Sequence, residues 1–225
     1  AANRQRFRTI IGLIDERASP SMERYGDDDN PALVAETPTF RVFQVRWPVL
    51  EGVTGEGLLL RPRLQPVGGV IAIPDADHTP EVLVGLAPGL PKEAQFARRL
   101  VESGFEVVVP VLISRAAEVS GHPDVNYTNM PHREWIYRQA FVMGRHIIGY
   151  DVQKVLSAVD WLKQRGGPCT RVGIAGYGEG GLIALYAAAS DTRIDATLVS
   201  GYFDSRRKVW KEPLDRTVWG LLREF

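Results

Sequence analysis

Residues 171–189 hold the pattern in this chain with the clearest chemical meaning. A short apolar run ends in the glycine-rich stretch 176–181, and an alanine-rich helical run follows at once. This order predicts a strand, a very tight turn and a helix packed closely on the strand. Such a turn can raise a nucleophilic side chain for acyl transfer, or its backbone N–H groups can hold a pyrophosphate. The central residue is Gly178, so no nucleophilic side chain stands there.

The spacing of the glycines matches the motif of pyrophosphate-binding turns. Gly176, Gly178 and Gly181 match G-x-G-x-x-G between an expected strand and an expected helix. Dinucleotide-binding units also carry an acidic residue about twenty positions later, and Asp204 lies near that place. Against this interpretation, about four strands are expected before the motif, whereas the motif usually follows the first strand of its sheet. Dinucleotide binding therefore stays an alternative that the strand order disfavours.

The strands expected around this turn fall into two kinds. Residues 40–47 alternate apolar and polar side chains, and with residues 56–61 they predict an antiparallel hairpin. Residues 70–73 and 105–112 are continuous apolar runs, as in strands that are buried on both faces. A further strand is expected at 194–200. Roughly six strands are expected in all.

Helical patterns separate these strands. We expect helices at about residues 4–14, at 92–103 and over a long region from about 133 to 164, while residues 209–225 look helical or irregular. The order is a hairpin followed by alternating strands and helices, which predicts a mostly parallel, doubly wound sheet with an antiparallel edge. We expect residues 1–38 to be a helix and an extended arm packed on one domain, residues 39–225.

The layout from about residue 40 to residue 200 resembles the α/β-hydrolase superfamily, and within it the branch of acetyl xylan esterases and dienelactone hydrolases. In that superfamily the nucleophile stands on a strained strand-to-helix turn, the nucleophile elbow. Residues 176–180, Gly-Tyr-Gly-Glu-Gly, match the G-x-S-x-G elbow at every place but the central one. The resemblance implies a three-layer α/β fold with a mostly parallel sheet and an antiparallel N-terminal hairpin, incomplete at its C-terminal side.

The resemblance also implies roles for individual residues. Gly178 occupies the nucleophile position, and the backbone N–H groups of Glu179 and Ala76 match the two donors of the oxyanion hole. Asp204 follows the next strand and is a candidate for the acid, while the chain ends before the usual region of the histidine. The residues expected to line the same pocket are Asp75, Asp77, His78, Tyr177 and Tyr202.

Glycine at the elbow has a physical rationale. The nucleophile of an elbow is held at positive φ, which costs of order 1–3 kcal/mol for a residue with a side chain. Glycine reaches that conformation without this strain. A protein that no longer needs the serine would gain stability by losing it, although a plain tight turn would use the same glycines.

Other polar residues have ordinary interpretations beside functional ones. The four histidines, His78, His122, His132 and His146, are expected to be surface or hydrogen-bonded residues, with His78 nearest the elbow. Asp75, Asp77 and His78 could offer a cation three ligands, but hydrogen-bonding aspartates in a turn explain them better. No metal or cofactor is expected. Arginines 133, 138 and 145 are expected to form surface ion pairs with Glu134, Asp151 or a ligand carboxylate.

Composition excludes several classes of protein. The 225 residues include 27 basic and 27 acidic side chains, so no charge excess favours nucleic acid or an anionic membrane. No apolar stretch approaches the roughly 18–20 residues of a membrane span. The one cysteine, Cys169, excludes an intrachain disulfide and any multi-cysteine zinc site. The chain begins Ala-Ala-Asn, which is compatible with cleavage of a secretory leader, so a secreted or periplasmic location stays open and the compartment is unknown.

Two functional hypotheses follow. The first is a domain related to carboxylic-ester esterases acting on acetyl or carbohydrate esters, catalytically impaired because Gly178 replaces the serine. The second is a non-catalytic domain that binds a carbohydrate or a protein partner through the same cleft. A missing nucleophile lowers the rate by orders of magnitude, so this chain favours a domain without esterase turnover. The oligomeric state is left open.

Overall fold

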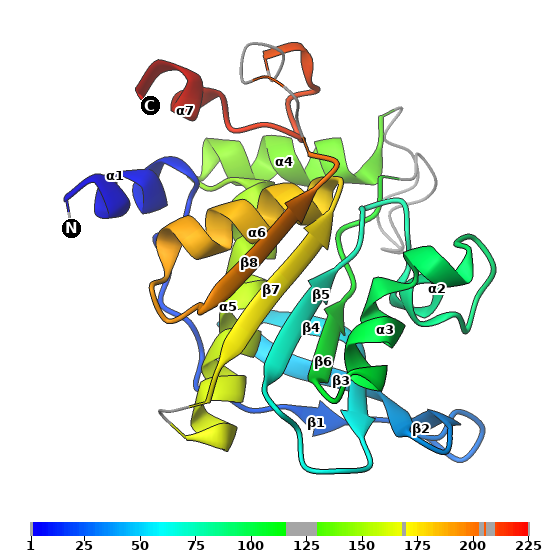
Figure 1. The fold of residues 1–225 in the computed structure, drawn as a ribbon. Coiled ribbons are helices and arrows are strands. Elements are labelled where there is room, and N and C mark those ends of the chain that lie inside the picture. The colour runs from blue at the N-terminus through cyan, green and yellow to red at the C-terminus, as the bar shows by residue number, and fades with distance from the viewer. Residues whose placement is uncertain (1, 116–129, 168–169, 203–204, 206–209, 225) are drawn as a thin grey trace.

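The computed structural model describes residues 2–115, 130–167, 170–202, 205 and 210–224 (Figure 1). The described residues form an eight-stranded mixed sheet in the order β1-β3-β4-β6-β5-β7-β8, with β2 paired on β3. Strands β6, β5, β7 and β8 run parallel, and the strands from β1 to β4 add antiparallel pairs. The strand bounds are β1 Glu23–Arg24, β2 Leu33–Glu36, β3 Phe40–Leu50, β4 Val53–Pro62, β5 Gly69–Ile73, β6 Glu106–Pro110, β7 Val172–Tyr177 and β8 Ala196–Ser200.

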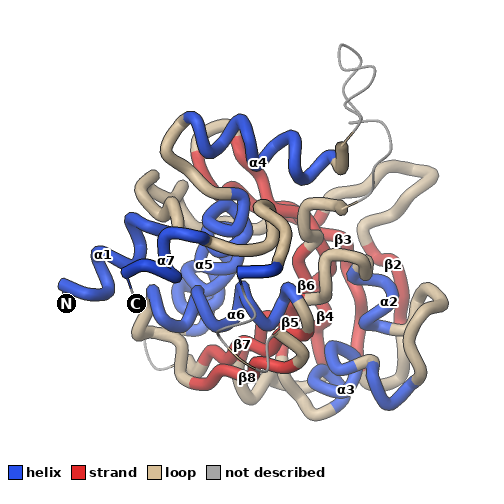
Figure 2. The backbone as a smooth tube through the Cα atoms, turned by 90° about the horizontal axis from the view of Figure 1, so that it is seen from above, coloured by secondary structure: helices blue, strands red, loops and turns tan. Residues whose placement is uncertain are grey.

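Helices cover both faces of this sheet, as the view from above shows (Figure 2). Helices α5 and α6 pack on one face, with α1, α4 and α7 on the same side, and α2 and α3 pack on the other. The bounds are α1 Ala2–Ile10, α2 Pro80–Val84, the 3-10 helix η1 Lys92–Ala94, α3 Phe96–Glu102, α4 His132–Val142, α5 Ile147–Gly166, α6 Glu179–Ser190 and α7 Trp219–Glu224. This is the predicted three-layer α/β architecture. No described helix is long and apolar enough to cross a membrane.

The predicted hairpin is confirmed as β3 and β4. Their residues pair in register from Phe40 opposite Pro62 to Trp47 opposite Gly55. Alternation along β3 places Val45 and Trp47 in the core beneath α5, where the Trp47 indole N–H donates to the Lys154 carbonyl at 3.2 Å. From Phe43 onward this alternation explains the period-two pattern, while Phe40 and Val42 at the start of β3 are buried on the opposite face, in the core beneath α2 and α3.

The structure corrects the sequence-based element list in three places. Within the expected extended arm, residues 23–24 and 33–36 form short strands on β3 that the sequence did not predict, because such short strands carry no readable periodicity. The expected helix 92–103 is divided into η1 and α3 at Gln95, and α2 precedes both. The long region 133–164 is two helices, because Gly144 at φ +70° ends the first and His146 caps the second.

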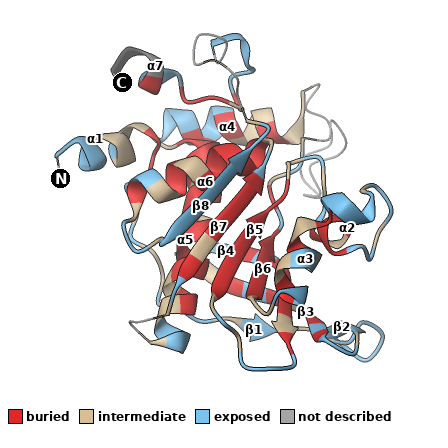
Figure 3. Cartoon of the chain, in the orientation of Figure 1, coloured by how far each residue is buried: buried red, intermediate tan, exposed pale blue. Residues whose placement is uncertain are grey.

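The last strand, β8, lies at the open edge of the sheet and is exposed along its whole length, as its pale blue colour shows (Figure 3). Its neighbours β7 and β5 are largely buried, so the well-packed centre of the sheet ends abruptly on this side. Leu198 on β8 is 60% exposed. The carboxyl ends of β5 and β7 lie next to each other, and the loops that follow them meet at one place above the sheet.

Candidate functional site

The turn from β7 into α6 is a sharp one, with Gly178 as the single residue between strand and helix. Gly178 has φ 58° and ψ −121°, a left-handed backbone conformation that a residue with a side chain adopts only with strain. Its N–H donates to the Ser200 carbonyl on β8 at 2.9 Å, and its carbonyl accepts from Gly181 at 3.0 Å. The turn is therefore fixed on both the strand side and the helix side.

Two flanking glycines allow α6 to approach the sheet. A Cβ on Gly176 would lie 2.0 Å from the Gly180 carbonyl oxygen, and a Cβ on Gly180 would lie 2.2 Å from the Ile73 carbonyl oxygen. Both contacts are with backbone, which cannot move aside as a flexible side chain can. The small residues predicted around the central position are thus required by close helix-to-strand packing.

The Asp75 carboxylate lies directly above Gly178. A Cβ on Gly178 would be 2.7 Å from Asp75 Cγ and 2.9 Å from both carboxylate oxygens. The N–H groups of Ala76 and Glu179 both donate to Asp75 Oδ1, at 2.8 and 3.1 Å. The two backbone donors that the resemblance assigns to an oxyanion hole therefore converge on one oxygen of this chain's own side chain.

Arg115 joins the three acidic side chains around this turn. Its guanidinium donates to Asp75 Oδ1 at 2.9 Å, to Asp77 Oδ2 at 2.9 Å and to Glu179 Oε2 at 2.6 Å. The Arg115 side chain is 12% exposed. Asp75 thus pairs with an arginine and with two turn N–H groups, and Asp77 pairs with the same arginine. Among the described residues no group of three acidic, histidine or cysteine side chains is arranged to hold a metal ion.

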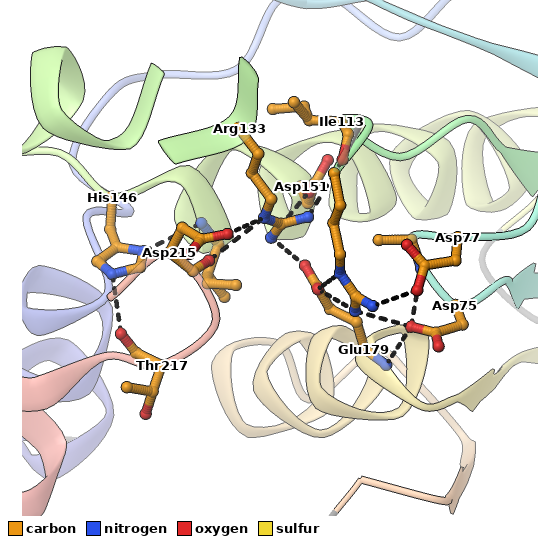
Figure 4. A network of polar contacts seen from close by, with 12 residues as sticks. Asp75, Asp77, Ile113, Arg133, His146, Asp151, Glu179, Asp215 and Thr217 are labelled. Atoms are coloured by element: carbon orange, nitrogen blue, oxygen red, sulfur yellow. Dashed lines mark hydrogen bonds and ion pairs between the residues drawn. The ribbon is translucent and has the colours of Figure 1, made fainter. Parts of the chain in front are cut away.

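Behind Glu179 lies a second, fully buried arginine (Figure 4). Arg133 is 0% exposed, and its Nη2 contacts Glu179 Oε1. Its Nε lies 3.4 Å from Asp215 Oδ2, and its Nη1 donates to the Ile113 carbonyl at 3.2 Å. The expected surface location of the Arg133 ion pair is wrong, because the start of α4 faces the core. Asp151, one of the partners named from the sequence, does lie within ion-pair distance, with its Oδ2 4.0 Å from Arg133 Nη2. Arg133 also connects the turn to the segment before α7.

Arg138 shows the contrast within the same helix. It pairs with Glu134 at 2.6 Å one turn away, and its side chain is 52% exposed, as expected for a surface pair. Arg145 pairs with Asp15 at 2.5 Å rather than with the partners named from the sequence. The helical repeat places Arg133 and Arg138 on different faces of α4, which a charge count cannot show.

Glu179 is held between the two arginines, with 2% of its side chain exposed. Burial raises the pKa of the Glu179 carboxyl, and the positive charges of Arg133 and Arg115 oppose that effect. Because both guanidinium groups donate to it or contact it, we describe Glu179 as an ionised bridge between them. Its side chain points away from the solvent-facing side of the turn, while its N–H points toward Asp75.

His146 connects the start of α5 to the segment before α7. Its Nδ1 accepts from the Ile148 N–H at 3.1 Å, and its Nε2 lies 3.1 Å from the Thr217 carbonyl, so the ring is neutral with its proton on Nε2. The ring is 6% exposed and packs edge-on against Tyr137. Burial lowers the pKa of His146 from 6.5 to about 4.

This histidine predicts an acid-sensitive contribution to stability. Between pH 6.5 and 4 the unfolded chain takes up a proton at His146 that the folded chain does not, so the free energy of unfolding falls as pH falls. The effect amounts to up to about 3 kcal/mol at pH 4. In urea titrations, the native protein should lose its stability advantage over His146→Gln across this pH window. An advantage that stays constant from pH 6.5 to 4 would contradict the assignment.

Two hollows border the turn. One is a cavity of about 530 Å3 between β7, β8 and the α2–α3 side, lined mainly by apolar side chains together with Asp75, His78 and Tyr177. The other, of about 210 Å3, is polar and is lined by Asp75, Arg115, Gly178, Glu179 and Tyr202, among others. Asp75 lies at both hollows.

The structure thus brings together most of the residues proposed from the sequence. Asp77 forms an ion pair with Arg115, which also contacts Asp75 and Glu179, and the Asp77 side chain is 62% exposed. Burial raises the pKa of Tyr202, whose hydroxyl interacts with Tyr186. Asp204, the candidate acid, lies outside the described residues. Sequence reasoning missed Arg115 and the buried role of Arg133, because neither stands near a recognisable motif.

Comparisons with known proteins agree with this fold. The dienelactone hydrolase family matches residues 57–210, and no curated protein sequence matches the chain. The fold is shared with solved acetyl xylan esterases from Paenibacillus sp. R4, at TM-score 0.56 and 14% identity, and from Thermoanaerobacterium sp., at 0.52 and 14%. These two alignments cover 100% and 99% of this chain, and 67% and 65% of the other chains.

A glucuronoyl esterase from Solibacter usitatus matches at TM-score 0.54 and 13% identity, over 86% of this chain and 56% of the other. For a Bacteroides fragilis protein the TM-score is 0.63 at 18% identity, over 87% of this chain and 51% of the other. The chain spans about half to two thirds of the length of these solved proteins. With a family match over more than half of its residues and this α/β-hydrolase fold, the chain belongs to the dienelactone hydrolase family.

Proposed function

We propose that this chain is a hydrolase-like domain related to carboxylic-ester esterases that lacks serine-type ester hydrolysis, because Gly178 occupies the nucleophile position. The observation that carries the proposal is the turn at Gly178, with φ 58° and ψ −121° between β7 and α6. This backbone would present a side chain at the top of the sheet, and glycine has none. The N–H groups of Ala76 and Glu179, which converge on one point, support the assignment of an oxyanion hole.

The substrate class of such a domain is proposed from its relatives and its cavity. The structural neighbours include acetyl xylan esterases and a glucuronoyl esterase, which are named for carbohydrate esters. The apolar cavity beside Tyr177 suits the acyl portion of a small ester more than a bare sugar. A small carbohydrate ester is therefore the ligand class that we propose, with Asp75, His78 and Tyr177 at the mouth of its cavity.

The proposal predicts no esterase turnover by the chain as it stands. With p-nitrophenyl acetate, the rate with protein should equal the buffer rate, and a fluorophosphonate probe should not label the protein, because serine attack is absent. Gly178→Ser tests whether other parts of the machinery remain. Turnover and labelling by the native chain would overturn the proposal, and the labelled residue, found by peptide mass spectrometry, would identify the nucleophile.

A non-catalytic binding role is the second candidate, and the cavity of about 530 Å3 favours it. Acetylated xylo-oligosaccharides should then raise the melting temperature, because a ligand of the native state stabilises it. Dinucleotide binding has less support. A pyrophosphate would need the N–H of Glu179, and that N–H already donates to the negatively charged Asp75 carboxylate. NAD(H) should accordingly leave the melting temperature unchanged.

A further inference from the structure

We propose that Asp75 is a built-in occupant of the oxyanion cradle, and that it closes this site to a substrate oxygen. The cradle consists of three donors: the N–H of Ala76, the N–H of Glu179 and the guanidinium of Arg115. This inference goes beyond the absence of a serine. It concerns what fills the site, and it is tested without measuring ester hydrolysis.

All three donors of the cradle are directed at a single atom. Ala76, Glu179 and Arg115 donate to Asp75 Oδ1 at 2.8, 3.1 and 2.9 Å. The oxygen of a substrate carbonyl would need the same N–H groups at a similar distance. It cannot share them with Oδ1, because two oxygens at hydrogen-bond distance from the same pair of N–H groups would overlap. A substrate can therefore use the cradle only if the carboxylate leaves.

The charge of the carboxylate holds it in place. Hydrogen bonds between ionised groups are about twice as strong as neutral ones, and Arg115 gives Asp75 such a bond. The Asp75 side chain is 23% exposed and that of Arg115 is 12% exposed, so water screens this pair only in part. Moving Asp75 out would leave two turn N–H groups without an acceptor and would remove one of the carboxylates that pair with Arg115.

Asp75 and Gly178 are complementary in shape. The three atoms nearest to a Cβ built on Gly178 all belong to Asp75, at 2.7 to 2.9 Å. Any side chain at position 178, a serine included, must displace the carboxylate from the cradle. The missing serine and the seated carboxylate are thus one feature of the site, because a side chain at position 178 and the Asp75 carboxylate in its present place exclude each other.

A double-mutant cycle in stability tests this pairing. In the native background, Gly178→Ala is destabilised both by the positive φ and by the steric clash with Asp75. In an Asp75→Ala background, only the strain of the positive φ remains. We expect Gly178→Ala to change the unfolding equilibrium constant roughly tenfold more in the native background than in the Asp75→Ala background. Gly144→Ala supplies a control for a side chain at positive φ in open space, because Gly144 has φ +70° and nothing within 4 Å of its built Cβ.

The outcomes of the cycle decide between two descriptions. If Gly178→Ala is about tenfold less disruptive in the Asp75→Ala background than in the native background, Asp75 fills the space above Gly178. Equal effects of Gly178→Ala in both backgrounds would overturn the proposal. Should Asp75→Ala fail to fold, Asp75→Ser serves the same cycle, since its shorter side chain also removes the carboxylate.

Acetate provides a second and independent readout of the cradle. In the Asp75→Ala variant, sodium acetate should raise the melting temperature above that in sodium chloride of equal ionic strength, because an external carboxylate can now accept the three hydrogen bonds. The native protein should show no such difference, and adding Arg115→Gln to Asp75→Ala should abolish it. An equal acetate effect on native and Asp75→Ala proteins would contradict the proposal. Neither readout uses ester hydrolysis, so the esterase assay can fail or succeed separately.

Discussion

Replacement of Arg133 by methionine is expected to lower the free energy of unfolding by about 3–5 kcal/mol. The side chain is fully buried, and its guanidinium contacts the carboxylates of Glu179 and Asp215 and the carbonyl of Ile113. Methionine keeps much of the apolar stem but leaves the buried Glu179 with only Arg115 as a cationic partner among the described residues. Removing one partner from a buried ion pair is far more destabilising than the net contribution of the pair. Urea unfolding monitored by circular dichroism measures the loss.

Arg138→Met is the matched control for this experiment. It lies on the same helix, α4, and pairs with Glu134 at 2.6 Å, but its side chain is 52% exposed. We expect it to lower the free energy of unfolding by about 0.3–0.5 kcal/mol. A loss below about 1 kcal/mol for Arg133→Met would show that the buried network is not a principal support of the turn.

Gly176→Ala is expected to destabilise the protein by at least about 3 kcal/mol or to prevent folding, at the upper end of what overpacking causes. The added Cβ would lie 2.0 Å from the carbonyl oxygen of Gly180 and 2.7 Å from the amide nitrogen of Gly181. Relief requires α6 to move away from β7, and that movement would separate the turn from Asp75 as well. Chemical denaturation, or soluble yield where the variant does not fold, reports the effect.

The same strand provides the control. Gly173 lies three residues earlier on β7, and the atoms nearest to its built Cβ are 3.7 Å away, an ordinary van der Waals distance. Gly173→Ala should change the free energy of unfolding by less than about 1 kcal/mol, with stabilisation possible because alanine restricts the unfolded chain. Similar losses for the two variants would mean that β7 tolerates no side chain anywhere, and not that the turn requires Gly176.

The sequence predicted those parts of the fold where one physical pattern dominates. The hairpin β3–β4 follows from alternation, and β5, β6 and β7 follow from apolar runs that are buried on both faces. The two-residue strand β1 is too short to show a period. Gly144 lies inside a long stretch of residues that favour helix, and one glycine in such a stretch need not end it, so the division between α4 and α5 was not apparent.

The candidate site was predicted only in part, for a similar reason. The glycine turn is a local pattern, and it correctly placed Gly178 between a strand and a helix. That the Asp75 carboxylate fills the space above Gly178 depends on a packing distance of a few ångströms between separate loops. The buried position of Arg133 depends on which face of α4 meets the core. Neither fact can be read from the residues of a single segment, so both became known only from the three-dimensional structure.

The contacts that build the turn join distant parts of the chain. Asp75 and Glu179 are separated by 104 positions, Arg115 and Glu179 by 64, and Arg133 and Asp215 by 82. Bringing such distant residues together costs conformational entropy before the hydrogen bonds and ion pairs between them can offset it. The strands β3 and β4, in contrast, are joined by a two-residue turn. In folding, the hairpin can therefore form early and locally, while the cluster around Gly178 can assemble only after the parallel strands have found their order.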